Sequence, residues 1–342
     1  VLVTGATGLL GRAIVKSFRG ANLDPPQSPA WEVLATGWSR ADGDVVAKLD
    51  LTQPSEVDAC LDRFKPDVVI HAAAEKRPDV AERDPERVQA VNVDATAHLA
   101  QHCARDGIFL IFISTDYVFD GQHPPYEVDA TTHPLNAYGR SKLAGEHAVI
   151  AAQPASTAET AAMPRGRYAV LRVPVLYGPA SPRAESAVNV LLDSLLAARD
   201  QAPAPAPPAP PAMDDYQQRF PTHVADVADV CRQLAARALQ LSSVAATAAA
   251  PTGVYHFSGT RQMTKWTMAS TLTALLEAQG ALKPATAADL LERGLKRVTT
   301  PTAGATAQRP DNAQLSNRRL QDEGYTLPQT DFTAWWRDAL AA

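Results

Sequence analysis

Val1-Leu-Val-Thr-Gly-Ala-Thr-Gly-Leu-Leu-Gly11 opens the chain, and apolar residues at helical spacing follow it in Arg12-Ala-Ile-Val-Lys-Ser-Phe18. A short apolar run that ends at a glycine is typical of a buried parallel strand, so the stretch predicts a strand, a turn and a helix. Glycines at this spacing permit a tight turn, close backbone approach to a pyrophosphate, and close packing of the helix. The phosphates would lie on free N–H groups at the start of the helix, although an ordinary strand–helix turn is the alternative. The residues expected to hold a dinucleotide here are Gly5, Thr7, Gly8, Leu9, Leu10 and Gly11.

The composition is that of an ordinary globular chain. Its 342 residues, 46% hydrophobic and 20% charged, suffice for two domains or for one large α/β unit with a smaller lobe. The net charge of −5 favours neither nucleic acid nor an anionic membrane as a partner. No apolar run reaches the roughly 18 residues of a membrane span and no secretory signal is visible, so we expect a cytoplasmic protein. Lone cysteines predict reduced thiols, and the histidines lack metal-site spacing, so no metal is expected.

A second strand is expected at residues 31–36, and Gly37-Trp-Ser-Arg40 follows it. The adenosine ribose of a nicotinamide cofactor normally lies beside the end of this strand, where an acidic residue binds the 2′-hydroxyl and an arginine accommodates a 2′-phosphate. Ser39 and Arg40 stand where the acid would be, which favours NADP over NAD. The alternative is a solvent-exposed arginine in a loop.

Strands and helices then alternate along the chain. Strands are expected at 45–51, 67–74, 108–114 and 168–174, and helices at 54–64 and 88–105. This alternation predicts a doubly wound parallel (Rossmann) sheet with its ligand crevice at the carboxyl ends of the strands. The further candidate contacts to a cofactor are Asp50, Leu51, Ala72, Ala73, Ala74 and Asn92.

A candidate catalytic group follows the strand that ends at Ser114. Tyr138 and Lys142 are four residues apart, so on a helix both side chains project from one face. A lysine ammonium near a phenol favours the phenolate, so we expect Lys142 to lower the pKa of Tyr138 toward the neutral range. Thr115 could hydrogen-bond the same substrate oxygen. The alternative is that these residues are purely structural.

These motifs together resemble a known superfamily. Thr4-Gly-x-x-Gly-x-x-Gly11 with Tyr138-x-x-x-Lys142 is similar to the extended short-chain dehydrogenases/reductases. Ser114-Thr-Asp-Tyr-Val-Phe-Asp-Gly121 and Pro134-Leu-Asn-x-Tyr-Gly-x-Ser-Lys-Leu-x-Gly-Glu146 narrow the resemblance to the dTDP-4-dehydrorhamnose-reductase-like branch. The resemblance implies that Thr115, Tyr138 and Lys142 are the catalytic trio, that NADP(H) lies over the glycine turn, and that the chain near Pro174 lies beside the nicotinamide.

Three strings in the second half resemble a more particular group. They are Gln217-Gln-Arg-Phe-Pro-Thr-His223, Gln262-Met-Thr-Lys265 and Ala307-Gln-Arg-Pro-x-Asn-Ala-Gln-Leu315. All three are similar to the regulatory (beta) subunits of methionine adenosyltransferase, which implies a catalytic methionine adenosyltransferase subunit as partner and a role in S-adenosylmethionine biosynthesis. The alternative is an NADPH-dependent reductase of a nucleotide-sugar ketone. The ligand candidates in this region are Gln218, Arg219 and Arg309, and Arg309 could equally fix a loop.

The expected domain organisation has two parts. Residues 1–175 would form the NADP-binding domain, with 225–257 returning to it, and residues 176–342 would form a smaller lobe for substrate or ligand. A helix is expected at 185–198 in this lobe. Segments rich in alanine and proline predict exposed insertions near 151–165, 201–212 and 241–251.

Overall fold

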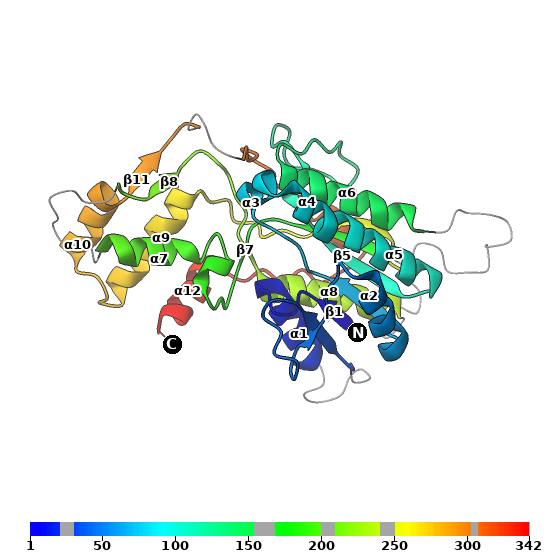
Figure 1. Cartoon of the computed structure of the whole chain (residues 1–342). Coiled ribbons are helices and arrows are strands. Elements are labelled where there is room, and N and C mark those ends of the chain that lie inside the picture. Colours follow the sequence, from blue (N-terminus) through cyan, green and yellow to red (C-terminus); the bar gives the residue numbers. More distant parts are fainter. Residues whose placement is uncertain (21–30, 154–167, 200–208, 240–249, 302–306, 342) are drawn as a thin grey trace.

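A seven-stranded sheet forms the centre of the larger lobe in the computed structural model, which describes residues 1–342 except 21–30, 154–167, 200–208, 240–249, 302–306 and 342 (Figure 1). The strand order is β10-β6-β5-β4-β1-β2-β3, and every pairing is parallel. The strands are β1 (Leu2–Thr4), β2 (Leu34–Gly37), β3 (Ala47–Lys48), β4 (Val68–His71), β5 (Phe109–Thr115), β6 (Tyr168–Val173) and β10 (Gly253–His256). The predicted doubly wound fold is confirmed.

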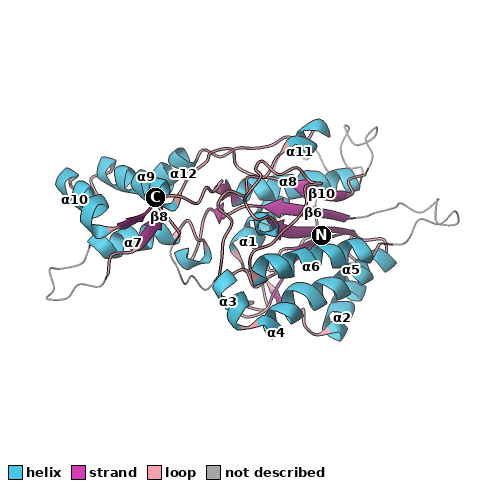
Figure 2. Cartoon of the chain, turned by 90° about the horizontal axis from the view of Figure 1, so that it is seen from above, coloured by secondary structure: helices cyan, strands magenta, loops and turns pink. Residues whose placement is uncertain are grey.

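Helices cover both faces of this sheet (Figure 2). Alternate strand residues explain why: Val3, Ile70 and Ile111 pack on one face, whereas Leu2 and Val69 pack on the other. The first face carries α1 (Leu9–Gly20) and α8 (Val224–Ala238), and the second carries α2 (Pro54–Phe64), α5 (Ala95–Arg105) and α6 (Ala137–Ala151). Because both faces are buried, the strands are almost continuously apolar, as parallel strands usually are.

Short helical segments connect these elements. The helix expected at 88–105 begins as α4 and a π-helical turn and becomes α-helical only at Ala95. The segments are α3 (Pro78–Arg83), α4 (Pro85–Val88), η1 (Gln89–Asp94), η2 (Asp116–Val118), η4 (Arg183–Glu185) and α11 (Arg318–Asp322).

A smaller lobe lies at one end of the sheet (Figure 1). Leucines of α7 and α9 and two aromatic residues of α12, Phe332 and Trp336, form its separate apolar core. Its elements are α7 (Val190–Arg199), β8 (Ala212–Asp214), α9 (Lys265–Ala278), α10 (Pro284–Asp289), η5 (Leu290–Gly294), β11 (Lys296–Val298) and α12 (Phe332–Ala341). A two-stranded pair, β7 (Leu176–Tyr177) with β9 (Thr222–His223), lies where the chain passes between the lobes.

Two expected elements differ from the structure at their ends. The strand expected at 45–51 is only two residues long, and its neighbour Asp42 forms a turn by accepting three backbone N–H bonds. The helix expected from Glu185 begins instead at Val190, after a 3-10 turn. Of the expected insertions, residues 154–165, 201–208 and 241–249 lie outside the described residues, and Ala212 begins β8, which pairs with β11.

The described part of the chain contains no helix that is both long and apolar enough to cross a membrane. Cys60, Cys103 and Cys231 are free and buried, and burial raises the pKa of each thiol.

A substitution at Gly11 can test how tightly α1 packs on the glycine turn. A Cβ at this position would lie 2.2 Å from the carbonyl oxygen of Gly5, whereas a Cβ on Gly20 of the same helix would meet nothing within 4 Å. We expect Gly11→Ala to destabilise the fold by about 1–3 kcal/mol through overpacking. Gly20→Ala should be neutral or stabilising by up to about 1 kcal/mol. Urea unfolding of the two variants measures the difference, and equal stabilities would contradict the packing described.

Candidate functional site

The glycine turn lies at the carboxyl end of β1, between the ends of its neighbours β2 and β4. Gly5 has a positive φ of 67°, and a Cβ there would lie 2.8 Å from the backbone of Ala73, so only glycine fits. The side chains of Leu9 and Leu10 are buried in the core, which leaves only their backbone N–H groups to face a ligand. The first turn of α1 therefore presents free amides at the crevice.

Two arginines flank this turn. Arg12, in the first turn of α1, donates to the Thr7 carbonyl and to both carboxylate oxygens of Glu185, at 3.2 and 2.5 Å. Arg40, next to the exposed Ser39 after β2, forms an ion pair with the same carboxylate. Lys76, after β4, donates to the Glu185 backbone carbonyl. The structure thus brings the predicted Arg40 to the crevice and adds Arg12, Lys76 and Glu185, which sequence reasoning missed.

The loop after β4 is fixed by Asn92. Its side-chain oxygen accepts from the Glu75 N–H at 2.8 Å, and its NH₂ donates to the Glu75 carbonyl and to the Ser141 hydroxyl, both at 3.0 Å. The amide therefore holds residues 72–75 against α6 and has its polar groups engaged within the protein. Asn92 acts as a positioning residue for the crevice.

The other predicted contacts lie around the same edge. Ala72, Ala73 and Ala74 are half-buried beside the turn, and Pro174 is buried at the end of β6. Asp50 accepts from the Thr52 N–H and hydroxyl at 2.9 and 2.7 Å, so its carboxylate shapes its own turn next to Leu51.

Thr115 and Tyr138 meet at the end of β5. The Thr115 hydroxyl donates to Asp116 at 3.0 Å and hydrogen-bonds with Tyr138. Tyr138 lies in the first turn of α6, which the Asn136 side chain caps by accepting from the Gly139 N–H at 2.9 Å. Lys142, one turn later, is 3% exposed, and its Nζ lies 3.9 Å from the centre of the Phe112 ring. The predicted trio therefore lies together.

Burial controls the ionisation of this trio. It lowers the pKa of Lys142 to about 7, although the nearby Glu146 raises it. Burial also raises the pKa of Tyr138. Desolvation disfavours the charged phenolate, and this effect is larger than the stabilisation of the phenolate by the hydrogen bond from Thr115. The prediction that the pKa of Tyr138 is lowered toward the neutral range is thus wrong for this structure, because burial, the largest influence, raises it. Desolvation also raises the pKa of Asp116, which is half-buried, to about 7.

A buried ion pair fixes α6 to the sheet. Arg172 of β6 donates to both carboxylate oxygens of Glu146, at 2.9 and 2.6 Å, and Ser114 donates to the same carboxylate at 2.5 Å. Both charged side chains are almost fully buried. Removing one partner of such a pair usually costs several kcal/mol, so this contact sets where Tyr138 and Lys142 lie.

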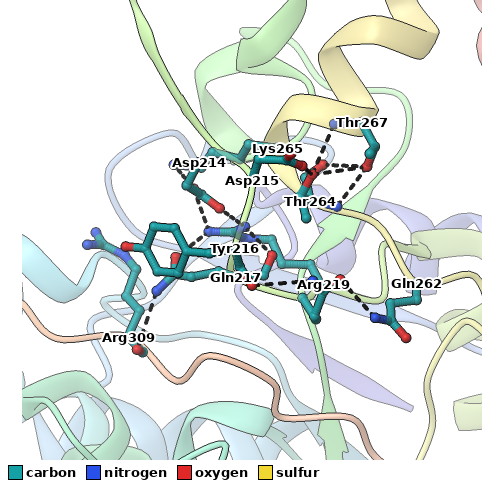
Figure 3. Close-up of polar contacts among 11 residues, drawn as sticks. Asp214, Asp215, Tyr216, Gln217, Arg219, Gln262, Thr264, Lys265, Thr267 and Arg309 are labelled. Atoms are coloured by element: carbon teal, nitrogen blue, oxygen red, sulfur yellow. Dashed lines mark hydrogen bonds and ion pairs between the residues drawn. The ribbon is translucent and has the colours of Figure 1, made fainter. Parts of the chain in front are cut away.

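Two of the residues predicted in the smaller lobe, Arg219 and Arg309, lie in one polar network (Figure 3), and the charges of both act on Tyr117, whose ring contacts that of Tyr138. Arg219 forms two bonds to Asp214, at 2.6 and 3.0 Å, and one to the Gln217 side chain. Gln218 accepts from Gln262 at 2.9 Å.

Arg309 crosses between the lobes. It forms an ion pair with Asp79 at 2.9 Å and hydrogen-bonds with Tyr117, beside Tyr138. Of its two predicted roles, these contacts favour fixing the loop. The cations at this end of the crevice are thus paired with protein carboxylates.

One polar cluster lies away from the crevice and was also missed. Asp62, His102 and Asp106 on α2 and α5 lie close enough to hold a metal ion. His102 is 1% exposed, and its two ring nitrogens already face Asp58 at 2.8 Å and Asp106 at 3.0 Å. Hydrogen bonding therefore accounts for the cluster.

The crevice fits a nicotinamide dinucleotide. The glycine turn offers backbone amides, the loop at 72–74 offers a surface without large side chains, and Arg12, Arg40 and Lys76 supply positive charge. The Thr115–Tyr138–Lys142 group lies at the carboxyl end of β5, where the reactive end of such a cofactor normally lies.

Comparison with known proteins agrees with this geometry. The family described as RmlD substrate binding domain matches residues 1–342. The chain belongs to this family. Methionine adenosyltransferase 2 subunit beta from Xenopus tropicalis is 40% identical to it over 339 residues, covering 99% of this chain and 86% of that protein. The resemblance expected from the sequence motifs is therefore confirmed.

Two reductases show how far the similarity extends. A dTDP-4-dehydrorhamnose reductase from Mycolicibacterium smegmatis is 41% identical over 158 residues, 45% of this chain and 42% of that protein. The structure of dTDP-4-dehydrorhamnose reductase from Bacillus anthracis in complex with NADP has a TM-score of 0.70 at 22% identity, covering 99% of this chain and 96% of that one. This last similarity shows that the two chains share a fold.

The lowered pKa of Lys142 predicts how the free energy of unfolding changes with pH. The folded chain holds this proton with a pKa of about 7, against an ordinary value of 10.5, so between these values the unfolded chain binds more protons and stability rises with pH. From pH 7 to pH 9, wild type should gain about 2 kcal/mol relative to Lys142→Met. Urea unfolding at several pH values measures this, and parallel profiles for the two proteins would show that Lys142 stays protonated.

Proposed function

We propose that this chain is a regulatory subunit that holds NADP(H) and binds a catalytic methionine adenosyltransferase, modulating S-adenosylmethionine synthesis. The observation that carries the proposal is 40% identity to a methionine adenosyltransferase 2 subunit beta over 99% of the chain. Because that similarity includes the smaller lobe, it extends to the region that would distinguish a regulator from a reductase.

The cofactor assignment rests on charge. Arg12 and Arg40 flank the turn at which a pyrophosphate and adenosine ribose would lie, and arginine suits a 2′-phosphate better than a free hydroxyl. The residues proposed to hold NADP(H) are Gly5, Thr7, Gly8, Leu9, Leu10, Gly11, Ser39, Arg40, Asp50, Leu51, Ala72, Ala73, Ala74, Asn92, Tyr138, Lys142 and Pro174. Asn92 contributes by holding the loop.

The state of the crevice supports a regulator. Arg219 is paired with Asp214, and Arg309 is paired with Asp79, so both arginines near Tyr117 already have anionic partners. An anionic nucleotide-sugar would have to break both pairs. We further propose that residues 1–175 and 225–257 hold the cofactor and that the remainder of 176–342 forms the ligand lobe. The proposed location of the protein is the cytoplasm.

The second candidate is an NADPH-dependent reductase of a nucleotide-sugar ketone, favoured by the grouping of Thr115, Tyr138 and Lys142. In that case the cofactor supplies the hydride, Tyr138 donates a proton to the ketone oxygen, and Thr115 orients it. The raised pKa of Tyr138 keeps its proton in place at neutral pH.

Association with the catalytic subunit tests the first candidate. We expect this chain to co-elute in size-exclusion chromatography with the catalytic methionine adenosyltransferase of the same organism at micromolar concentration, and to change the kinetics of S-adenosylmethionine synthesis. The dTDP-4-dehydrorhamnose reductase of Mycolicibacterium smegmatis is the matched control and should do neither. Separate elution with unchanged kinetics would refute the proposal. NADPH oxidation by a 4-keto sugar nucleotide that is lost in Tyr138→Phe would favour the reductase.

A further inference from the structure

Glu185 lies in an unusual place for a carboxylate. It belongs to η4, on the segment that leads from β7 to α7, yet its side chain reaches the dinucleotide crevice of the larger lobe. That side chain is 8% exposed, whereas the side chains of Arg12 and Arg40 that bind it are 37% and 47% exposed. The carboxylate is therefore enclosed, and the two arginines lie between it and solvent.

The cations around Glu185 come from three neighbouring strand ends. Arg12 follows β1, Arg40 follows β2 and Lys76 follows β4, and these three strands are adjacent in the sheet. Three cations against one carboxylate leave a net charge of +2. Burial lowers the pKa of Lys76, and the charges of Arg40 and Arg12 lower it further, whereas Glu75 opposes this. Even without the charge of Lys76, two arginines face one carboxylate, so positive charge remains in excess.

We propose that Glu185 occupies the subsite of the cofactor's 2′-phosphate and competes with it, so that this residue weakens the binding of a phosphorylated dinucleotide relative to one without the phosphate. The proposal rests on the proposed binding of NADP(H). A phosphate monoester carries about −1.5 to −2 charge at pH 7 and three acceptor oxygens, so it satisfies the arginines better than a carboxylate does. A dinucleotide without this group offers no replacement and leaves Glu185 paired.

The backbone beside Glu185 is held independently of its carboxylate. The Ser186 hydroxyl donates to the Leu176 carbonyl at 2.7 Å and accepts from two backbone N–H groups, and Asn189 donates to the Gly178 carbonyl at 2.8 Å. Displacing the carboxylate therefore needs only a side-chain rotation. For the same reason, Glu185→Gln should fold normally, which thermal unfolding without ligand can check.

The test compares binding of NADPH and NADH to wild type, Glu185→Gln, Arg40→Ala and Asp193→Asn by calorimetry. Glu185→Gln keeps the shape but removes the competing charge, so NADPH should bind about tenfold more tightly and NADH less than twofold more tightly. Asp193 pairs with Arg183 outside the crevice and serves as the matched control, with no change expected. Arg40→Ala should weaken NADPH binding far more than NADH binding.

The outcomes separate two failures. If Glu185→Gln binds NADPH no better than wild type, or more weakly, then Glu185 orients the arginines and does not compete, and the inference is overturned while NADP(H) binding stands. Equal tightening of NADPH and NADH would also overturn it. If none of the four proteins binds either nucleotide, the proposed cofactor function itself fails.

Discussion

The close approach of Gly5 to the backbone of Ala73 is the contact on which the crevice depends. A Cβ at Gly5 would come within 2.9 Å of three backbone atoms of the loop after β4, and a Cβ at Gly11 would overlap the Gly5 carbonyl. Because both positions are glycines, the turn, the start of α1 and the 72–76 loop can pack together. This packing brings Arg12 and Lys76 to Glu185, and the free amides of the first turn of α1 lie at the same crevice.

The fold was predictable because its signals are local. Glycine spacing, apolar strands and Pro54 at the start of α2 each act within a few residues, and the seven-stranded sheet follows from them. The partners of Glu185 were not predictable, since Arg12, Arg40 and Lys76 are 173, 145 and 109 residues away in sequence. The pKa of Tyr138 was also mispredicted, because spacing to Lys142 gives proximity and says nothing about burial. Burial depends on the whole fold.

The contrast between the two sides of the crevice explains the proposed role. On the cofactor side, two arginines bind one carboxylate and Lys76 lies beside them, which suits a doubly charged phosphate. On the opposite side, Arg219 and Lys265 share Asp214, and Arg309 pairs with Asp79, which leaves a smaller excess of positive charge for a second anion. A chain built in this way can hold a dinucleotide tightly and still act through a protein partner.

The most direct measurement is S-adenosylmethionine synthesis by the catalytic subunit in the presence of NADP(H) and either wild-type chain or Tyr138→Phe. If the cofactor is held and not consumed, both proteins should change the kinetics of synthesis equally, because the phenol has no chemical step to perform. A Tyr138→Phe chain that still binds NADP(H) and the catalytic subunit but no longer alters synthesis would contradict this, and would show that hydride transfer is part of the function.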